Sequence, residues 1–195
     1  MAVLTWLGVP AVSGLWSRLG FHADGDRVRI GEVAVEAGVS PLAWGFDELL
    51  ADASAFGVPT SLVPPPDGEA PAHPNAVDRI DHVVYNVPDL DRAVATIADV
   101  LRLEPRLRSR PYGDSGPEMA FFRAGRPVLE VADGAPAPAL WGLALRSPDL
   151  DVTVAAVRGA GGSIGEPKPA VQGGRIATVR DAGVPLAVLE RPPKP

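Results

Sequence analysis

The clearest pattern of hydrophobic and polar positions lies at residues 80–101, IDHVVYNVPDLDRAVATIADVL. Its first half alternates, which predicts a β-strand with Val83 and Tyr85 on one face and His82 on the other. In its second half apolar residues recur at helical spacing behind Asp89, a residue type that caps helix N-termini. The pattern predicts a strand followed by an amphipathic helix that covers the Val83 face, so that His82 points to the opposite, concave side.

The same order of elements is predicted twice after residue 79. The first copy has a strand at 80–87, a helix at 89–102, and strands at 105–109, 118–124 and 127–132. The second has a strand at 140–146, a helix at 149–161, and strands near 163–166, 175–180 and 185–190. The motif PDLD stands between strand and helix in both copies, at 88–91 and 148–151. Repetition of this kind indicates two β-α-β-β-β modules.

Residues 1–63 are predicted to be a partial copy of the same unit. GEVAVEAGVSPLAWGF (31–46) parallels GRPVLEVADGAPAPALWGLAL (125–145), so that Glu36 matches Glu130 and Trp44 matches Trp141. We expect one and a half modules without the final strands, and a helix behind Asp47. Because a partial copy exposes strand edges, we expect it to pack on the C-terminal modules or on a second protomer, the latter giving a homodimer.

The most proline-rich stretch separates these parts of the chain. Residues 64–76 hold five prolines in thirteen positions, which no helix or central strand tolerates. We therefore predict an N-terminal domain at 1–63, a linker at 64–78 and a two-module domain at 79–193. His22, in a turn, and His73, in the linker, are expected to be solvated.

Composition narrows the function classes. The net charge of −6 argues against nucleic acid or an anionic membrane as the main partner. The absence of cysteine excludes disulfides, thiolate metal sites and cysteine nucleophiles. No run approaches the ~18–20 apolar residues that span a bilayer, and the apolar N-terminus lacks a basic segment and a cleavage site. We expect a cytoplasmic protein whose partner is a small molecule.

The repeat resembles a known family. IDHVVYNVPDLDRAV, then VLEV, then GGRIATVRD are similar to the vicinal oxygen chelate superfamily of glyoxalase I, bleomycin-resistance proteins and extradiol dioxygenases, over about residues 79–192. The resemblance implies an α+β fold. Its paired βαβββ modules form a curved, mostly antiparallel eight-stranded half-barrel with helices outside. It also implies lyase, isomerase or ring-opening dioxygenase chemistry.

The resemblance also implies site residues. Metal-binding members take a His from the first strand and a Glu from the last strand of each module, and His82 and Glu130 match these positions in the first module. In the second module the matching positions hold Gly142 and either Ala187 or Val188, and in the N-terminal copy the histidine position holds Leu4. His82 and Glu130 are thus candidates for a catalytic acid–base pair or for two ligands of Zn, Ni, Fe or Mn, and no cofactor is certain.

Six further residues come from strands and loops that should border the cavity. Three arginines suit a carboxylate, phosphate or enolate oxygen of a ligand, and three aromatic residues suit an apolar pocket: Arg123, Arg146, Arg175, Phe121, Tyr112 and Trp141. The alternatives are solvent-facing arginines and ordinary core aromatics.

Three functions stay open. The first is an enzyme in which His82 and Glu130 transfer protons and an arginine stabilises the oxyanion. The second is a non-catalytic protein that sequesters an aromatic or cationic drug or metabolite, as the bleomycin-resistance relatives imply. The third is a structural remnant without a ligand.

Overall fold

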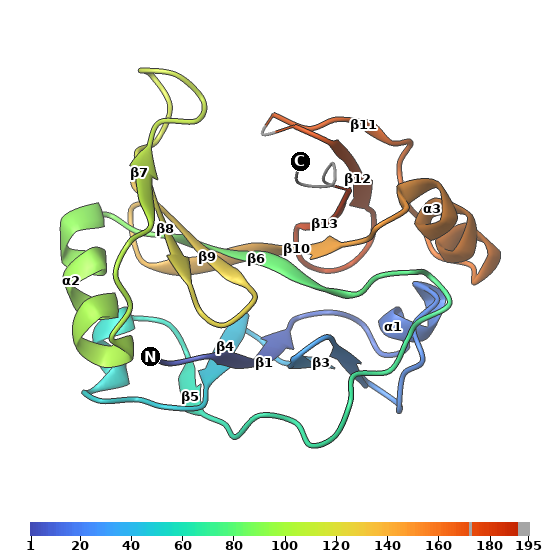
Figure 1. The fold of residues 1–195 in the computed structure, drawn as a ribbon, viewed down its shortest axis with the longest axis horizontal. Coiled ribbons are helices and arrows are strands. Elements are labelled where there is room, and N and C mark those ends of the chain that lie inside the picture. The colour runs from blue at the N-terminus through green and yellow to red at the C-terminus, as the bar shows by residue number, and fades with distance from the viewer. Residues whose placement is uncertain (172, 191–195) are drawn as a thin grey trace.

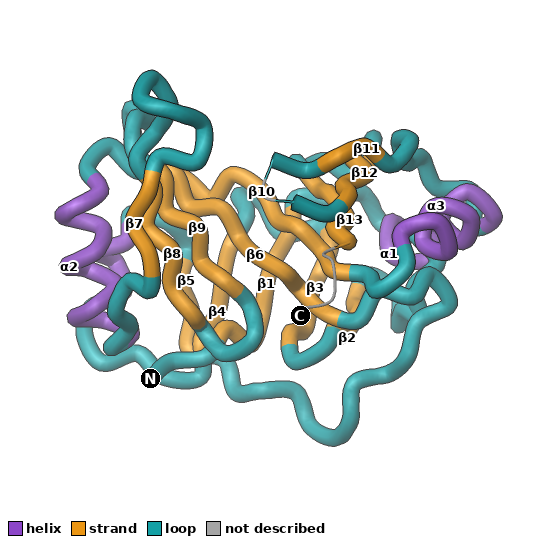
Figure 2. The backbone as a smooth tube through the Cα atoms, turned by 45° about the horizontal axis from the view of Figure 1, so that its top comes forward, coloured by secondary structure: helices purple, strands orange, loops and turns teal. Residues whose placement is uncertain are grey.

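Two β-sheets stack face to face in the computed structural model, which describes residues 1–171 and 173–190. Figure 1 shows the N-terminal sheet below the larger sheet, with α2 at one end and α1 and α3 at the other. Figure 2 shows the strands of both sheets from a second side. No helix in the described part of the chain is long and apolar enough to cross a membrane.

The eight-stranded sheet consists of two βαβββ modules joined along β6 and β10. The first module holds β6 (Arg79–Asn86), α2 (Leu90–Leu101), β7 (Leu107–Ser109), β8 (Met119–Arg123) and β9 (Val128–Ala132). The second holds β10 (Ala139–Arg146), α3 (Leu150–Gly159), β11 (Lys168–Pro169), β12 (Arg175–Val179) and β13 (Leu186–Glu190). The strand order β11-β12-β13-β10-β6-β9-β8-β7 confirms the predicted repeat. The strand expected near 163–166 is only a single bridge at Ile164, and β11 follows it.

The five-stranded sheet has a related arrangement in a shorter chain segment. It holds β1 (Leu4–Val9), α1 (Leu15–Arg18), β2 (Arg27–Ile30), β3 (Val33–Ala37), β4 (Ala43–Phe46), the 3-10 helix η1 (Ala53–Phe56) and β5 (Thr60–Leu62), in the strand order β2-β3-β1-β4-β5. β1 is parallel to β3 and antiparallel to β4, as β6 is to β9 and β10. The short β5 lies parallel to β4, in the place that β13 has beside β10, although no final strand was expected there.

The pairing registers correct the sequence alignment of the two sheets by two residues. His82 lies opposite Val128 on one side and Ala144 on the other. In the smaller sheet the residue with the corresponding partners, Ala34 and Gly45, is Trp6. Trp6, not Leu4, therefore occupies the position of His82.

The same registers separate the two tryptophans that the sequence analysis matched. Trp44 corresponds to Leu143 and faces the core, where it is fully buried. Trp141 is 56% exposed. Trp141 is the extra residue of a β-bulge in β10, between Leu140 and Gly142, so it does not have the core-facing place of Trp44.

The helix expected behind Asp47 does not form. The carboxylate of Asp47 accepts a hydrogen bond from the backbone N–H of Val3, 2.7 Å away, and so ties the end of β4 to the N-terminus. The short helix η1 begins later, where Asp52 caps the backbone N–H of Ser54. Asp89 does cap α2 as predicted, by accepting from the N–H of Arg92 at 3.0 Å.

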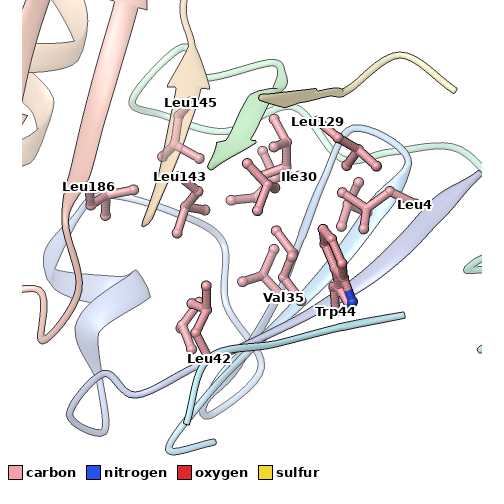
Figure 3. Close-up of a cluster of buried hydrophobic side chains, with 14 of the residues drawn as sticks. Leu4, Ile30, Val35, Leu42, Trp44, Leu129, Leu143, Leu145 and Leu186 are labelled. Atoms are coloured by element: carbon pink, nitrogen blue, oxygen red, sulfur yellow. The ribbon is translucent and has the colours of Figure 1, made fainter. Parts of the chain in front are cut away.

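One hydrophobic core lies between the two sheets. Figure 3 shows Leu4, Val35 and Trp44 of the N-terminal sheet facing leucines of the larger sheet, Leu129, Leu143, Leu145 and Leu186. Val83 is fully buried on this same face, as the alternation predicts. The N-terminal sheet thus packs in cis on the C-terminal modules, one of the two expected arrangements; the homodimer stays a prediction.

An aromatic cluster anchors the contact between the sheets. The ring of Tyr85 lies 5.1 Å from that of Trp44 and 6.3 Å from that of Phe56, measured between centroids. The Tyr85 hydroxyl donates to the backbone carbonyl of Phe56. Burial raises the pKa of Tyr85 to about 12, because the phenolate would lose its hydration.

The end of the predicted linker is buried, so the expectation of a solvated His73 is wrong. Its Nδ1 accepts from the backbone N–H of His22 at 3.3 Å, and its Nε2 lies 2.7 Å from the carbonyl oxygen of Arg29. His73 is only 8% exposed, whereas His22 is exposed as expected. Nearby, Asn75 donates to the carbonyl of Leu19, so this segment fastens the two sheets together.

Replacing Trp44 with alanine should lower the free energy of unfolding by about 3–5 kcal/mol, because it empties the centre of the core between the sheets. Trp141→Ala is the matched control and should change that free energy by less than about 0.5 kcal/mol, since the side chain is exposed. Urea denaturation of both variants measures the difference. Equal losses would contradict the assignment of the two tryptophans.

His73 should make the stability of the protein depend on pH. Its pKa is lowered, first by desolvation, with the hydrogen bond to Arg29 opposing and the charge of His22 adding to the shift. The folded state therefore binds this proton less readily than the unfolded state. The contribution of neutral His73 is complete above pH ~6.5 and is lost as the pH falls from there through the lowered pKa.

The free energy of unfolding of wild type and His73→Gln, measured at pH 7.5 and 5.5, tests this. The advantage of the wild type should shrink at the lower pH. His22→Gln is the control and should keep most of the wild type's pH dependence, because the charge of His22 is the smallest of the three causes of the shift. An advantage that grows on acidification would contradict a neutral, buried His73.

Candidate active site

A cavity of about 520 Å³ opens on the concave face of the eight-stranded sheet. In Figure 1 the segment joining β7 to β8 and the strand β11 rise on either side of β6 and β10, away from the N-terminal sheet. Most of the described wall is apolar, and the polar side chains in it are few: His82, Glu130, Tyr112, Lys168 and Thr178. This size and lining suit a small organic molecule.

His82 stands at the module-one end of this cavity, oriented by its neighbour Asp81. Its Nδ1 lies 3.0 Å from Oδ1 of Asp81, close enough for a charge-assisted hydrogen bond. The carboxylate accepts the Nδ1–H, and this fixes the tautomer of the neutral ring. Among the described residues Nε2 has no hydrogen-bond partner, and it remains as the nitrogen available to a ligand.

A β-bulge makes this pair possible. In β6, Ile80 lies opposite Leu145 and His82 opposite Ala144, so Asp81 is an extra residue in the strand. Strict alternation would place Asp81 and His82 on opposite faces, but a bulge re-aims side chains locally. Asp81 could not be recognised from the sequence for this reason, since the bulge depends on how β10 pairs with β6.

Glu130 completes a group of three ionisable residues. It comes from β9, opposite Val84, and its Oε1 lies 3.5 Å from Nδ1 of His82. Glu130 is 6% exposed and Asp81 is 8% exposed. Two carboxyl groups and one imidazole can exchange protons at this short range, and acid–base catalysis needs such an arrangement.

The second module lines the cavity but has no ionisable side chain at the positions that match His82 and Glu130. By the strand pairing, Gly142 stands where the first module has His82, and Ala187 where it has Glu130. A Cβ on Gly142 would lie 2.4 Å from the carbonyl oxygen of Pro185, so β10 passes close to the preceding turn. Glu190 receives hydrogen bonds from Arg175 and from the backbone N–H of Leu150, and it does not line the cavity.

None of the three arginine candidates lines the cavity. Arg175 binds Asp151 and Glu190, and the hydrogen bond that it donates to Asp151 is the main cause of its raised pKa. Arg123 is exposed and donates to the carbonyl of Arg126 at 2.7 Å. Arg146 is half-buried at the end of β10.

Two of the three aromatic candidates do line the cavity. Tyr112 and Trp141 belong to its wall and are 58% and 56% exposed. Phe121 lies opposite Glu130 on the neighbouring strand but is not part of the wall. The structure thus brings His82, Glu130, Tyr112 and Trp141 to one cavity.

The residues present do not fit the metal site that the resemblance implies. The first module supplies His82 and Glu130, and the matching positions of the second module, Gly142 and Ala187, have no donor atom. In the described part of the chain no three His, Cys, Asp or Glu side chains are grouped so as to hold a metal ion. A stable site needs three or four protein ligands.

Two solved structures, each with a TM-score of 0.51, share the fold of this chain. Methylmalonyl-CoA epimerase from Mycobacterium tuberculosis is 23% identical with a TM-score of 0.51, over 60% of this chain and 91% of the other. A hypothetical protein from Bacillus halodurans is 17% identical with a TM-score of 0.51, over 60% and 96%. A variant of the Streptomyces coelicolor epimerase in complex with 2-nitronate-propionyl-CoA is 19% identical with a TM-score of 0.49, over 60% and 99%. No curated protein matches the chain.

A family comparison covers the part of the chain that forms the cavity. Residues 79–183, more than half of the chain, match the Glyoxalase/Bleomycin resistance protein/Dioxygenase superfamily. These residues contain the first module and all but the last strand of the second, including Asp81, His82 and Glu130. The paired modules and the sequence match lead to one conclusion: the chain belongs to the Glyoxalase/Bleomycin resistance protein/Dioxygenase superfamily.

Proposed function

We propose that this protein is an isomerase- or lyase-type enzyme that moves protons on a small organic ligand in the cavity. The observation that carries the proposal is the Asp81–His82 pair, which directs one imidazole nitrogen to a carboxylate and leaves the other for the ligand. An oriented, neutral histidine in a largely apolar cavity is a typical general base. The proposal does not depend on the likeness to the epimerases, which supports the fold alone.

In the proposed reaction Nε2 of His82 removes a proton from a carbon next to a carbonyl group. The electron pair of the broken C–H bond forms a C=C bond, and the carboxyl group of Glu130 donates its proton to the carbonyl oxygen, giving an enol. The enol then loses its O–H proton to Glu130 and takes a proton at carbon, which restores the carbonyl; protonation on the other face of that carbon gives an isomer. If instead a group on the next carbon departs with its bonding electron pair and takes the proton held by His82, the same loss of the O–H proton restores the carbonyl and gives a lyase product. Glu130 takes the role that the sequence analysis assigned to an arginine, because none of the three arginines lines the cavity.

The proposed reaction does not use a metal ion. His82 and Glu130 alone are two donors, fewer than the dioxygenase class of the family requires. The proton-transfer classes therefore suit these residues better than ring-opening oxidation.

Non-catalytic binding is the second candidate. The observation that favours it is the exposed aromatic pair at the cavity, Tyr112 and Trp141, which suits capture of an apolar ligand without any reaction. The two candidates differ in what His82 does. It is essential for turnover in the enzyme and contributes only part of the affinity in the binding protein.

Proton transfer can be followed by incubating the protein with a panel of carbonyl compounds in D₂O and observing loss of C–H signals by NMR. We expect His82→Gln to slow exchange by about 10²–10⁴-fold. Asp81→Asn should slow it by at least about tenfold, because an amide no longer selects the Nδ1–H tautomer. Glu36→Gln, at the position of Glu130 in the N-terminal sheet, and His22→Gln should leave the rate unchanged. Exchange that survives His82→Gln would contradict the proposal. So would a panel in which compounds bind to the protein but none exchanges its C–H protons.

Metal removal separates the proposed chemistry from that of metal-dependent relatives. Dialysis against EDTA should leave the exchange rate within about twofold of the untreated rate, since the two donors present bind a divalent ion weakly. The metal content before and after dialysis is measured alongside. A rate that falls on dialysis and returns with one equivalent of Zn, Ni, Fe or Mn would contradict the metal-free proposal.

A further inference from the structure

We propose that the cavity takes a planar aromatic ligand that is uncharged at one end and anionic at the other. The uncharged end lies at His82, the aromatic body lies between Trp141 and Tyr112, and the anionic group lies at Lys168. The placement of the uncharged end rests on the proposed function. The other two features rest on the lining of the cavity itself.

The acidic end of the cavity disfavours an anion. Asp81, whose carboxylate accepts the Nδ1–H of His82, is buried at this end, so a carboxylate or phosphate placed there would face like charge at short range. Among the residues that the structure describes, no arginine or lysine lines this end to offset the repulsion. A carbonyl or hydroxyl group can hydrogen-bond with these residues without that cost.

The middle of the cavity is apolar and wide. Ala144 and Ala187 present only methyl groups there, and Ile176 and Leu189 from the neighbouring strands add to the apolar wall. A hydrocarbon body gains about 25 cal/mol for each Å² that leaves water on this surface. The second module therefore suits the apolar part of a ligand.

Two aromatic side chains from different modules stand at the mouth. Trp141 is the extra residue of the bulge in β10, since Leu140 lies opposite Tyr85 and Gly142 opposite Val84. The bulge turns its indole toward the cavity, where it is 56% exposed. Tyr112 lines the same cavity from the loop between β7 and β8 and is 58% exposed. Exposed aromatic rings of this kind stack on planar ligands.

Lys168 supplies a positive charge that nothing in the described structure neutralises. It is the one lysine among the described residues, it lines the cavity from β11, and no described carboxylate forms an ion pair with it. Its neighbour Glu166 is paired instead with Arg158, 2.6 Å away. Lys168 is therefore available to a carboxylate, sulfonate or phosphate group of the ligand.

Two dyes with the same ring system test this inference. 8-Anilinonaphthalene-1-sulfonate carries an anionic group, and N-phenyl-1-naphthylamine lacks it; the fluorescence of both rises on binding. Trp141→Ala should raise the Kd of both dyes about tenfold, because both lose the stacking partner. Lys168→Met should raise the Kd of the sulfonate about fivefold and leave that of the neutral amine unchanged.

Matched variants away from the cavity control for unspecific effects. Leu62→Ala removes an exposed apolar side chain on β5, and Arg106→Met removes an exposed charge before β7; neither should change the Kd of either dye. Failure of both dyes to bind, an equal effect of Lys168→Met on both, or no effect of Trp141→Ala would overturn the inference. His82→Gln should retain dye binding. If the protein binds the dyes as expected but catalyses no C–H exchange, the inferred ligand class stands and the proposed enzymatic function is contradicted.

Discussion

The packing of the five-stranded sheet on the convex face of the eight-stranded sheet is the contact on which the rest of the structure depends. β6 and β10 have one apolar face that must be buried, and Val83, Tyr85 and Leu143 bury it against the N-terminal residues. Because side chains alternate along a strand, burial of this face directs His82 and Val84 to the other side. The N-terminal sheet thus fixes which residues the cavity receives.

The first strand of the repeat occurs three times in the chain, and each copy has a different residue at the position of His82. In the first module of the larger sheet the key position holds His82, and the second module holds Gly142. The N-terminal sheet holds Trp6, whose indole lies over Gly8. Glu36 keeps the position of Glu130 but forms an ion pair with Arg27 at 3.1 Å. Among the described residues only the first module combines an imidazole with an acid group that faces a cavity, and the site is correspondingly one-sided.

Much of the fold could be predicted from the sequence, because its signals are local. The alternation at His82, the cap at Asp89 and the repeated PDLD motif each depend on residues close in the chain, and the structure confirms the elements that they predict. Asp81 could not be placed, because its orientation depends on a bulge that forms only when β10 pairs with β6. The arginines were wrongly expected in the cavity for a similar reason: Arg175 finds its partners on α3 and β13, and no local pattern shows that. His73 was expected in solvent because proline-rich segments usually are exposed, whereas here the N-terminal sheet closes over it.

The central claim is that the bulge in β6 sets the tautomer of His82, and long-range ¹H–¹⁵N NMR of the imidazole rings tests it directly. Above pH 7.5 the account predicts the Nδ1–H tautomer for His82, since Nδ1 donates to Asp81. It predicts the opposite, Nε2–H tautomer for His73, whose Nδ1 accepts from His22 and whose Nε2 donates to Arg29, so the two rings serve as controls for each other. Asp81→Asn should abolish the preference at His82 alone. An Nε2–H tautomer at His82 in the wild type would contradict the account.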